Sequence, residues 1–185
     1  FKSRLLGGGA RPNLFEVELT TLPASVTFPW QAERFGFLCK AANMPAMTIA
    51  NIDVPFRGRI FKVAGDRTIE NWSITVINDE DFLFRNAFEE WTQQIAALDD
   101  NMGSTNPASY MVNAKVYQLG RGSSVASTNN TGDTNVVLKE YEFIDIFPIS
   151  VGAIDLSYEN SDSIEEYPVE FAVQSYRVNG AGTAG

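Results

Sequence analysis

The sequence predicts a mainly β fold, a two-sheet β-barrel or sandwich flanked by one α-helix at about residues 79–98. About seven or eight short segments alternate apolar and polar residues with the period of two that is typical of strands. One segment instead repeats its apolar residues every three or four positions, as an amphipathic helix does. With 185 residues, 44% of them hydrophobic, the chain is expected to form a single domain, residues 1–185, around its own core.

The N-terminal part is expected to hold two strands joined by an irregular loop. Residues 1–10 contain three consecutive glycines near their end and predict a flexible arm. Alternating residues then predict a strand over 13–21, and an apolar run predicts a second strand over 35–40. The segment between them, 23–34, is expected to be a loop.

Residues 43–59 are expected to be extended. Pro45 and Pro55 argue against a central strand, because proline cannot donate a backbone hydrogen bond to a neighbour. Two interpretations remain open here, a surface hairpin with solvated arginines or an exposed arm that reaches a neighbouring subunit. Gly65-Asp66 is predicted to form a tight turn before the next strand, since glycine accepts positive φ and aspartate bonds its own backbone.

A strand and the predicted helix follow this turn. The strand, over 68–77, alternates between an apolar face and an uncharged polar face. Asn78 is predicted to cap the helix, with three acids in its positive first turn at 79–81. One apolar stripe is expected to face the core: Phe84, Phe88, Trp91, Ile95 and Leu98.

The C-terminal half is expected to consist of strands separated by polar segments. The glycine-, serine- and asparagine-rich stretch 120–135 predicts a mobile excursion. The stretch 136–151 predicts either a pair of strands or one bent strand, because Pro148 interrupts it. The other expected elements are a strand over 109–119, an acidic turn region over 155–166, a last strand over 168–178 and a flexible tail over 179–185.

Composition argues against catalysis and against tight binding of nucleic acid. The chain has no histidine, which removes the Ser-His-Asp triad and most zinc sites. Its one cysteine, Cys39, lies in an apolar run and is expected to be a buried, inert thiol. Glu140 and Glu142 share a strand face, but no other group converges on them in the sequence, so we expect no enzyme activity, no metal and no cofactor. A formal charge of −9 repels the phosphates of nucleic acid, which argues against tight binding. No apolar run approaches the roughly 20 residues that a membrane helix needs.

Several sequence blocks resemble the tail tube proteins of contractile-tailed, T-even-like bacteriophages. They occur in the order of that family and cover roughly the first half of the chain, whereas the last strands are similar in pattern only. Residues 22–36 and 120–135 depart from the family pattern and look like insertions. The blocks are ARPNLF (10–15), CKA (39–41), MPA (44–46), VAGDRT (63–68), Trp72 and VINDE (76–80).

This resemblance implies a two-sheet barrel with one helix, related in fold to the haemolysin-coregulated protein of type VI secretion. It implies a structural virion protein: six copies close a ring, and rings stack into the inner tube of a contractile tail through which DNA leaves. The implied partners are other copies of the chain, the tail sheath protein, baseplate and tube-terminating proteins. The tape-measure protein and genomic DNA would occupy the lumen without sequence-specific binding. Assembly is expected in the host cytoplasm, without stable membrane insertion.

Two candidate assembly surfaces follow from the resemblance and the strand pattern. The segment 43–59 corresponds in place to the family's long loop toward the adjacent ring, and the polar face of the strand 68–77 suits a wet lumen wall or an intersubunit contact. The candidate inter-ring residues are Met44, Ile49, Ile52, Phe56, Arg57 and Arg59. The candidate lumen or intersubunit residues are Asn71, Ser73 and Thr75.

Three alternatives remain open. The two nearest are a baseplate protein that initiates a tube and a tube protein of a phage-derived injection particle, which share the barrel and are barely separated by sequence alone. A more distant alternative is a monomeric carbohydrate-binding β-sandwich, with aromatic side chains as stacking platforms. The candidate platforms are Trp30, Tyr110, Tyr141 and Tyr158.

Overall fold

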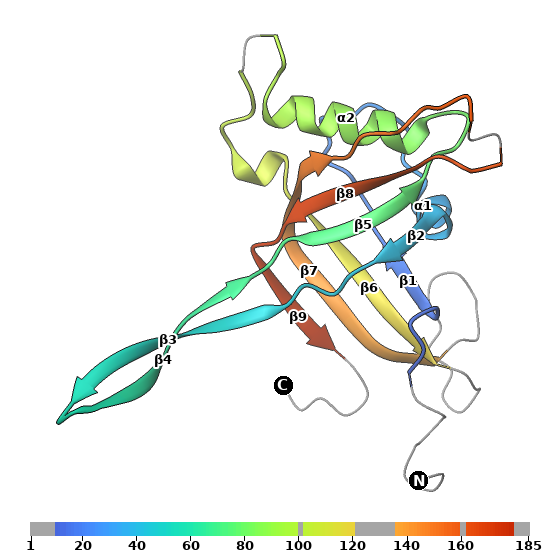
Figure 1. Ribbon diagram of the computed structural model, residues 1–185. Helices are drawn as coiled ribbons and strands as arrows, with labels where there is room; N and C mark the ends of the chain where they lie inside the picture. The colour runs from blue at the N-terminus through green and yellow to red at the C-terminus, as the bar shows by residue number, and fades with distance from the viewer. Residues whose placement is uncertain (1–9, 100–101, 121–135, 160–161, 180–185) are drawn as a thin grey trace, which may run out of the picture.

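One long strand, β7 (Val136–Val151), connects the two sheets of the fold (Figure 1). The computed structural model describes residues 10–99, 102–120, 136–159 and 162–179. Up to Ile146, β7 pairs with β6 (Val112–Gly120), and its middle also pairs with β9 (Ser175–Asn179). Beyond that point it pairs with β8 (Glu166–Ala172). The stretch 136–151 is therefore one bent strand, the second of the two predicted possibilities.

The bend in β7 has a local cause at Asp145, which has a φ of 57°. Few residues other than glycine adopt this left-handed conformation, although aspartate does so more readily than most. The Asp145 N–H donates a hydrogen bond to Oδ1 of Asn113 on β6, at 3.1 Å, so a side chain replaces the backbone partner that the bend removes. The strand can then change sheets without leaving this donor unpaired.

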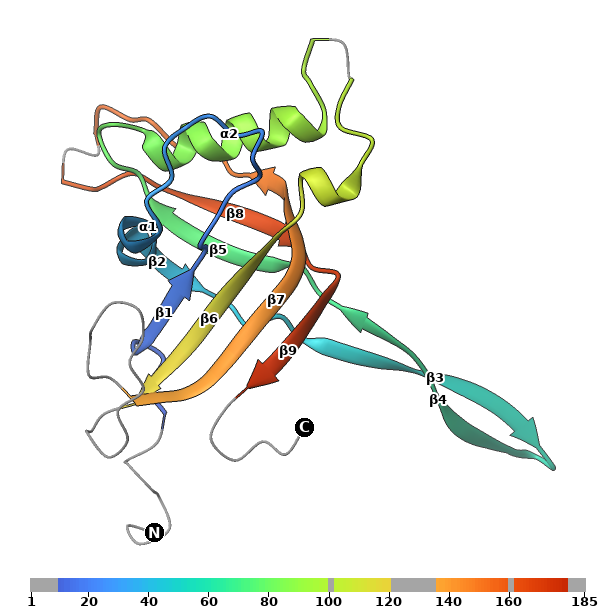
Figure 2. The same ribbon diagram turned by 180° about the vertical axis from the view of Figure 1, so that it is seen from behind.

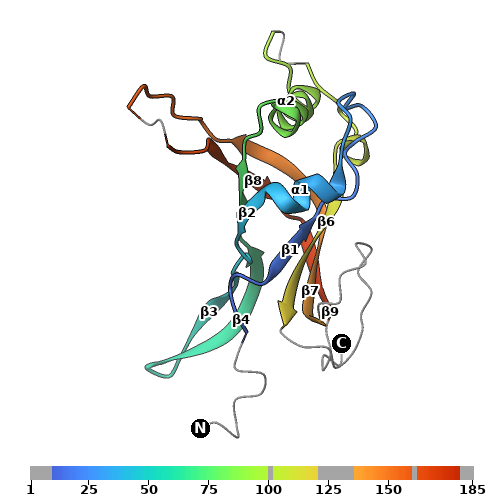
Figure 3. The same cartoon turned by 90° about the vertical axis from the view of Figure 1, so that its right-hand side faces the viewer.

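The strands form a two-sheet sandwich, as predicted. The first sheet has the order β1 (Phe15–Glu18), β6, β7 and β9, and the second has the order β7, β8, β5 (Trp72–Ile77) and β2 (Cys39–Ala42). All pairings are antiparallel. Within the described residues, the path of paired strands ends at β1 and at β2. The short helix α1 (Ala32–Leu38) lies between these two ends (Figure 3).

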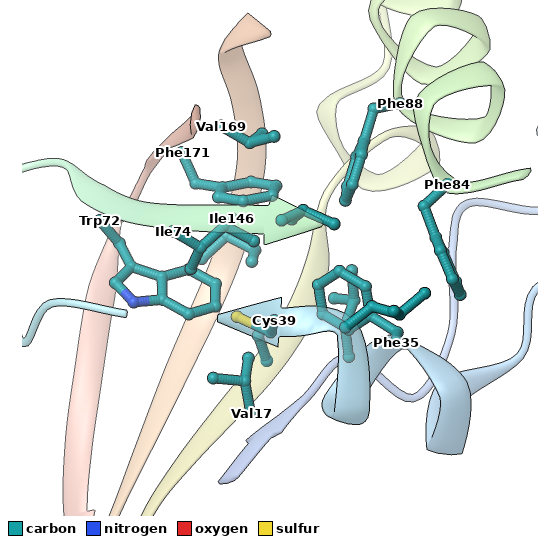
Figure 4. Packing of buried hydrophobic residues seen from close by; sticks show 14 of the residues in the cluster. Val17, Phe35, Cys39, Trp72, Ile74, Phe84, Phe88, Ile146, Val169 and Phe171 are labelled. Atoms are coloured by element: carbon teal, nitrogen blue, oxygen red, sulfur yellow. The ribbon is translucent and has the colours of Figure 1, made fainter. Parts of the chain in front are cut away.

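Helix α2 (Leu83–Ile95) covers one end of the sandwich (Figures 1 and 3). Its predicted apolar stripe is confirmed at three residues, Phe84, Phe88 and Trp91, which are buried. The Phe88 ring lies 5.9 Å from the ring of Phe171 on β8 and 6.0 Å from the ring of Phe35 on α1. Figure 4 shows these side chains converging from α2, α1 and the sheets on one core.

Helix α2 is shorter than the predicted helix. It begins after Phe82, which has a φ of 52°, and it ends at Ile95. Leu98 therefore lies beyond the helix and is 84% exposed, not buried on the stripe. Asn78 does not cap the helix, because the N-cap position is Phe82. The backbone N–H and the side-chain amide of Asn78 donate to Glu165 instead, at 2.8 and 2.9 Å.

The acids before α2 bind an arginine as well as the helix terminus. Asp79 and Asp81 both pair with Arg34 of α1, and Oδ1 of Asp81 accepts a hydrogen bond from the Leu83 N–H at 3.2 Å. The hydrogen bond from Arg34 lowers the pKa of Asp79 below its ordinary value of 3.8. These acids thus hold α1 against the loop that precedes α2.

The predicted strand over 35–40 is wrong for most of its length, because α1 occupies residues up to Leu38. Phe35 and Leu38 are buried and lie three residues apart, on one side of a helical turn. A strand would place Phe35 and Phe37 on the same face, but Phe37 is 84% exposed. Only the four residues of β2 are extended, and Cys39, Ala41 and Ala42 pair with β5.

Two other predicted boundaries change. The last strand, predicted over 168–178, is divided at Val173 and Gln174 into β8 and β9, which pair with different halves of β7. Gly65-Asp66 forms no turn, because both residues lie inside β4 (Arg59–Ile69) beside a register shift between Ile49 and Asn51 of its partner strand. The turn of that hairpin lies at Arg57 and Gly58, with φ values of 48° and 80°.

The segments that the sequence predicts to be flexible lie almost wholly outside the described residues. This applies to 1–9 of the N-terminal arm, 121–135 of the excursion and 180–185 of the tail. Two residues that were predicted to belong to these segments lie in strands, since Gly120 ends β6 and Asn179 ends β9. No helix in the described ranges is long and apolar enough to cross a membrane.

Candidate assembly surfaces

A two-stranded arm, made of β3 (Met47–Phe56) and β4, projects away from the sandwich (Figures 1 and 2). The two strands pair with each other and form a separate sheet. Every residue of β3 is exposed, and in β4 only Gly65 and Ile69 are partly covered. An isolated hairpin is marginally stable in water, so this arm is poorly suited to remain without a partner.

The outer half of the arm has one apolar face. Residues directly opposite each other in an antiparallel pair point to the same side of a sheet. The pairs Ile52–Val63, Val54–Phe61 and Phe56–Arg59 alternate with Asn51–Ala64, Asp53–Lys62 and Pro55–Ile60. The first set is mainly apolar, and we call it the apolar arm face: Ile52, Val54, Phe56, Phe61 and Val63. Phe56 and Phe61 are 65% and 66% exposed, which is typical of a surface that another protein covers.

The tip of the arm is basic. Arg57 and Arg59 flank Gly58, and the Arg57 guanidinium lies 5.3 Å from the centre of the Phe56 ring. The arm as a whole, 47–69, contains four basic and two acidic residues in a chain whose formal charge is −9. Its charge is therefore opposite in sign to that of the rest of the protein.

The structure places most of the predicted inter-ring residues on this arm. Ile52, Phe56 and Arg59 share one face, Ile49 lies on the other side of the register shift, and Arg57 is in the turn. Met44 does not belong to the arm, because it lies between β2 and β3. The sequence analysis missed the contribution of β4, although the apolar residues of 60–63 were a signal for it.

The predicted polar strand face lies on the outer side of the second sheet. Ser73 and Thr75 are half-buried on β5, opposite Glu170 and Pro168 of β8. The Ser73 N–H donates to Oδ1 of Asn43 at 2.8 Å, which ties the strand to the chain entering the arm. Asn71 is exposed and lies one residue before β5, so it is outside the strand to which it was assigned.

The outer side of the first sheet is a charged surface, of which the sequence analysis singled out only Glu140 and Glu142. Alternation along β1, β6 and β7 was the available signal. Lys115 pairs with Glu140 at 3.1 Å, and the Tyr117 hydroxyl donates to Glu18 at 2.7 Å. The hydrogen bond to Glu140 raises the pKa of Lys115, and burial together with the Glu18 carboxylate raises the pKa of Tyr117. Glu140 is thus part of a structural ion pair.

The described residues offer little for catalysis or sugar stacking. No three Cys, Asp or Glu side chains among them are grouped so that they could hold a metal ion. Of the four candidate stacking aromatics, Trp30 packs on Phe35 and Phe84, and its Nε1 donates to the Leu19 carbonyl at 2.6 Å. Tyr158 alone of the four is fully exposed. The four aromatics therefore do not form one platform.

We expect the thiol of Cys39 to be unreactive in the folded protein. Burial raises its pKa from 9.0 to about 12, so the thiolate forms only in strongly alkaline solution. At about pH 8, iodoacetamide should leave native Cys39 unmodified and should alkylate it once guanidinium unfolds the chain. Mass spectrometry of the two samples gives the result. Rapid alkylation of the native protein would contradict this assignment.

Taken together, the sandwich, the projecting arm and the polar outer faces are typical of a structural protein that contacts other subunits. The comparison with known proteins agrees. The phage tail tube protein family matches residues 10–179, and the chain belongs to this family. It is 34% identical to the tail tube protein gp19 of Enterobacteria phage T4 over 167 residues, which cover 90% of each chain. The predicted recognition is thus confirmed, and the protein is a structural component of phage tails.

Solved structures of contractile injection systems share the fold. A chain in the cryo-EM structure of the anti-feeding prophage baseplate aligns with a TM-score of 0.62 and 13% identity, covering 95% of this chain and 98% of the other. A chain in the sheath–tube complex of an extracellular contractile injection system, PVC, aligns with a TM-score of 0.59 and 12% identity, covering 98% and 99%. At these identities the likeness concerns the fold alone.

Proposed function

We propose that the chain is the repeating subunit of the inner tube of a contractile phage tail, with six copies in each ring and rings stacked into a conduit for DNA. The observation that carries this proposal is the solvent-exposed arm on a member of the tail tube family. The arm leaves a row of apolar side chains in water, and stacking would bury them against the next ring. The arm residues Ile49, Ile52, Phe56, Arg57 and Arg59 would make this inter-ring contact.

Lateral contacts within a ring have candidate sites at the sheet edges. Within the part of the chain that the structure describes, the strands at the ends of the path, β1 and β2, and the outer strand β9 each leave backbone groups on one side for a neighbour. Pairing between neighbouring subunits would satisfy these groups and remove the aggregation hazard of open edges. The outer faces of both sheets are polar, and Ser73 with Thr75 would line either the lumen or such a contact.

The charge of the chain supports passage of DNA without binding. Gripping the phosphate backbone requires clustered basic side chains, whereas this subunit has a formal charge of −9. The tape-measure protein and then the genome would therefore occupy the lumen without adhering to it. We infer a role that is mechanical and not catalytic.

Partners at the outside and the ends of the tube follow from the structural relatives. Similar folds occur in baseplate, cap and sheath–tube assemblies of other systems. We propose that this subunit contacts a sheath protein, a baseplate and a tube terminator, and that it assembles in the host cytoplasm before residing in the virion. The 34% identical relative is a phage protein, which favours a phage tail over an injection particle.

Electron microscopy of the purified protein, with light scattering for its mass, tests the proposal. With increasing concentration we expect sixfold rings or hollow tubes of uniform width, because each subunit carries its own arm and open edges. A monomeric mass at every concentration, without rings, would contradict self-assembly and would bring the carbohydrate-binding alternative forward.

A further inference from the structure

The connection between β7 and β8 is a second surface that exposes large apolar side chains, here among acidic and hydroxyl-bearing residues. Its two arms, 153–157 and 163–166, line a hollow of about 220 Å³. Leu156 and Ile164 lie at this hollow and are 79% and 70% exposed. Exposed apolar side chains that gather at one place, and are not scattered singly, are typical of an interaction site. We call this surface the β7–β8 hollow.

The β7–β8 hollow is acidic where the arm is basic. The segment 153–166 contains five acidic residues and no lysine or arginine. Two of the acids have partners in the same chain, since Glu165 accepts from Asn78 and Glu166 pairs with Lys40 at 2.5 Å. Asp155 and Asp162 are exposed and make no ion pair within the described residues. Their charges are available to a partner.

The hollow and the arm lie at opposite ends of the subunit. In Figure 1 the connection between β7 and β8 projects at the upper right, whereas the arm projects at the lower left, and Figure 2 shows the same separation from behind. A subunit therefore cannot place its own arm in its own hollow. Complementary surfaces at opposite ends produce a head-to-tail contact, which repeats from copy to copy.

We propose that the arm tip of one copy docks in the β7–β8 hollow of the next copy along the stack. This proposal rests on the proposed tube function and names the receiving surface. The basic side chains of Arg57 and Arg59 would lie against Asp155 and Asp162. The apolar arm face would at the same time cover Leu156 and Ile164. Opposite charges would select the register of the two copies, and the apolar contact would hold them together.

Charge reversal tests the pairing. The variants R57E/R59E and D155K/D162K should each lower the amount of sedimentable tube more than about tenfold, because like charges across an interface cost several kcal/mol. A chain that carries all four substitutions should recover tubes, since the pairs are again opposite in sign. The matched control E33K/E80K makes the same change in net charge as D155K/D162K at two exposed acids elsewhere, and it should assemble normally.

Cross-linking gives a second readout that does not need long tubes. We expect full-length R57C mixed with full-length L156C to give a cross-linked dimer with a short bismaleimide, while buried Cys39 stays unreactive. Replacing L156C by F37C, at a similarly exposed position, should give no cross-linked dimer. If wild-type tubes form but D155K/D162K also forms them and no dimer appears, the docking proposal is overturned and the tube function stands. If wild type forms no tubes and R57C mixed with L156C gives no dimer, both proposals are overturned.

Discussion

Replacing the whole arm, residues 47–69, by a two-residue turn is expected to abolish tube formation and to leave the sandwich folded. At the base of the arm the Glu70 N–H donates to the Ala46 carbonyl at 3.2 Å, so the two ends are already close enough for a tight turn to join them. The arm contributes no residue to the buried core. Its removal should therefore change the melting temperature little, while it deletes every contact that the arm makes with another copy.

Two variants test whether assembly needs the apolar arm face or only the presence of the arm. F56S/F61S keeps the hairpin but removes its largest apolar side chains, and it should strongly reduce assembly. N51S changes the opposite face of the same strand pair and should assemble like wild type. Electron microscopy and circular dichroism measure assembly and folding separately. Normal tubes from the shortened chain would exclude the arm as the inter-ring contact.

The arm also shows where sequence reasoning succeeded and where it failed. Exposure and extension of 43–59 followed from its prolines and arginines, but the turn was placed at Gly65-Asp66, the pair with the better turn chemistry. The observed turn uses Arg57 in a left-handed conformation that non-glycine residues seldom adopt. Gly58, with a φ of 80°, was a local signal for this turn, but local propensity could not choose between it and Gly65-Asp66, because the register of β3 on β4 fixes where the chain reverses.

The body of the fold was easier to predict, since most of its signals are local. The alternating pattern correctly predicted that Trp72, Ile74 and Val76 are buried. The helical period correctly predicted the burial of Phe88 and Trp91. The seven-residue helix α1 was missed because it spans only two turns, too few for a helical period to stand out from an apolar strand. The division of β7 between two sheets depends on pairing with strands far away in the sequence, which no local pattern contains.

Truncating Trp91 to alanine is expected to destabilise the fold by about 3–5 kcal/mol, the usual cost of removing a large buried aromatic side chain. Trp91 is fully buried, and its ring lies 6.0 Å from that of Phe171 on β8. Its Nε1 donates to the Tyr110 carbonyl at 2.8 Å, so the truncation also leaves a carbonyl without its donor. For a chain of this size, the melting temperature should fall by roughly 6–20 °C.

Leu98→Ala is the matched control for Trp91→Ala, because the sequence placed both residues on one stripe and the structure separates them. Leu98 is 84% exposed beyond the end of α2, and its truncation should change stability by less than about 0.5 kcal/mol. Denaturant unfolding of both variants gives the two free energies on one scale. Equal losses would place Leu98 in the core and extend the packed helix beyond Ile95. If Trp91→Ala left the free energy of unfolding unchanged, α2 would cover something other than the core. The end of the sandwich would then be open.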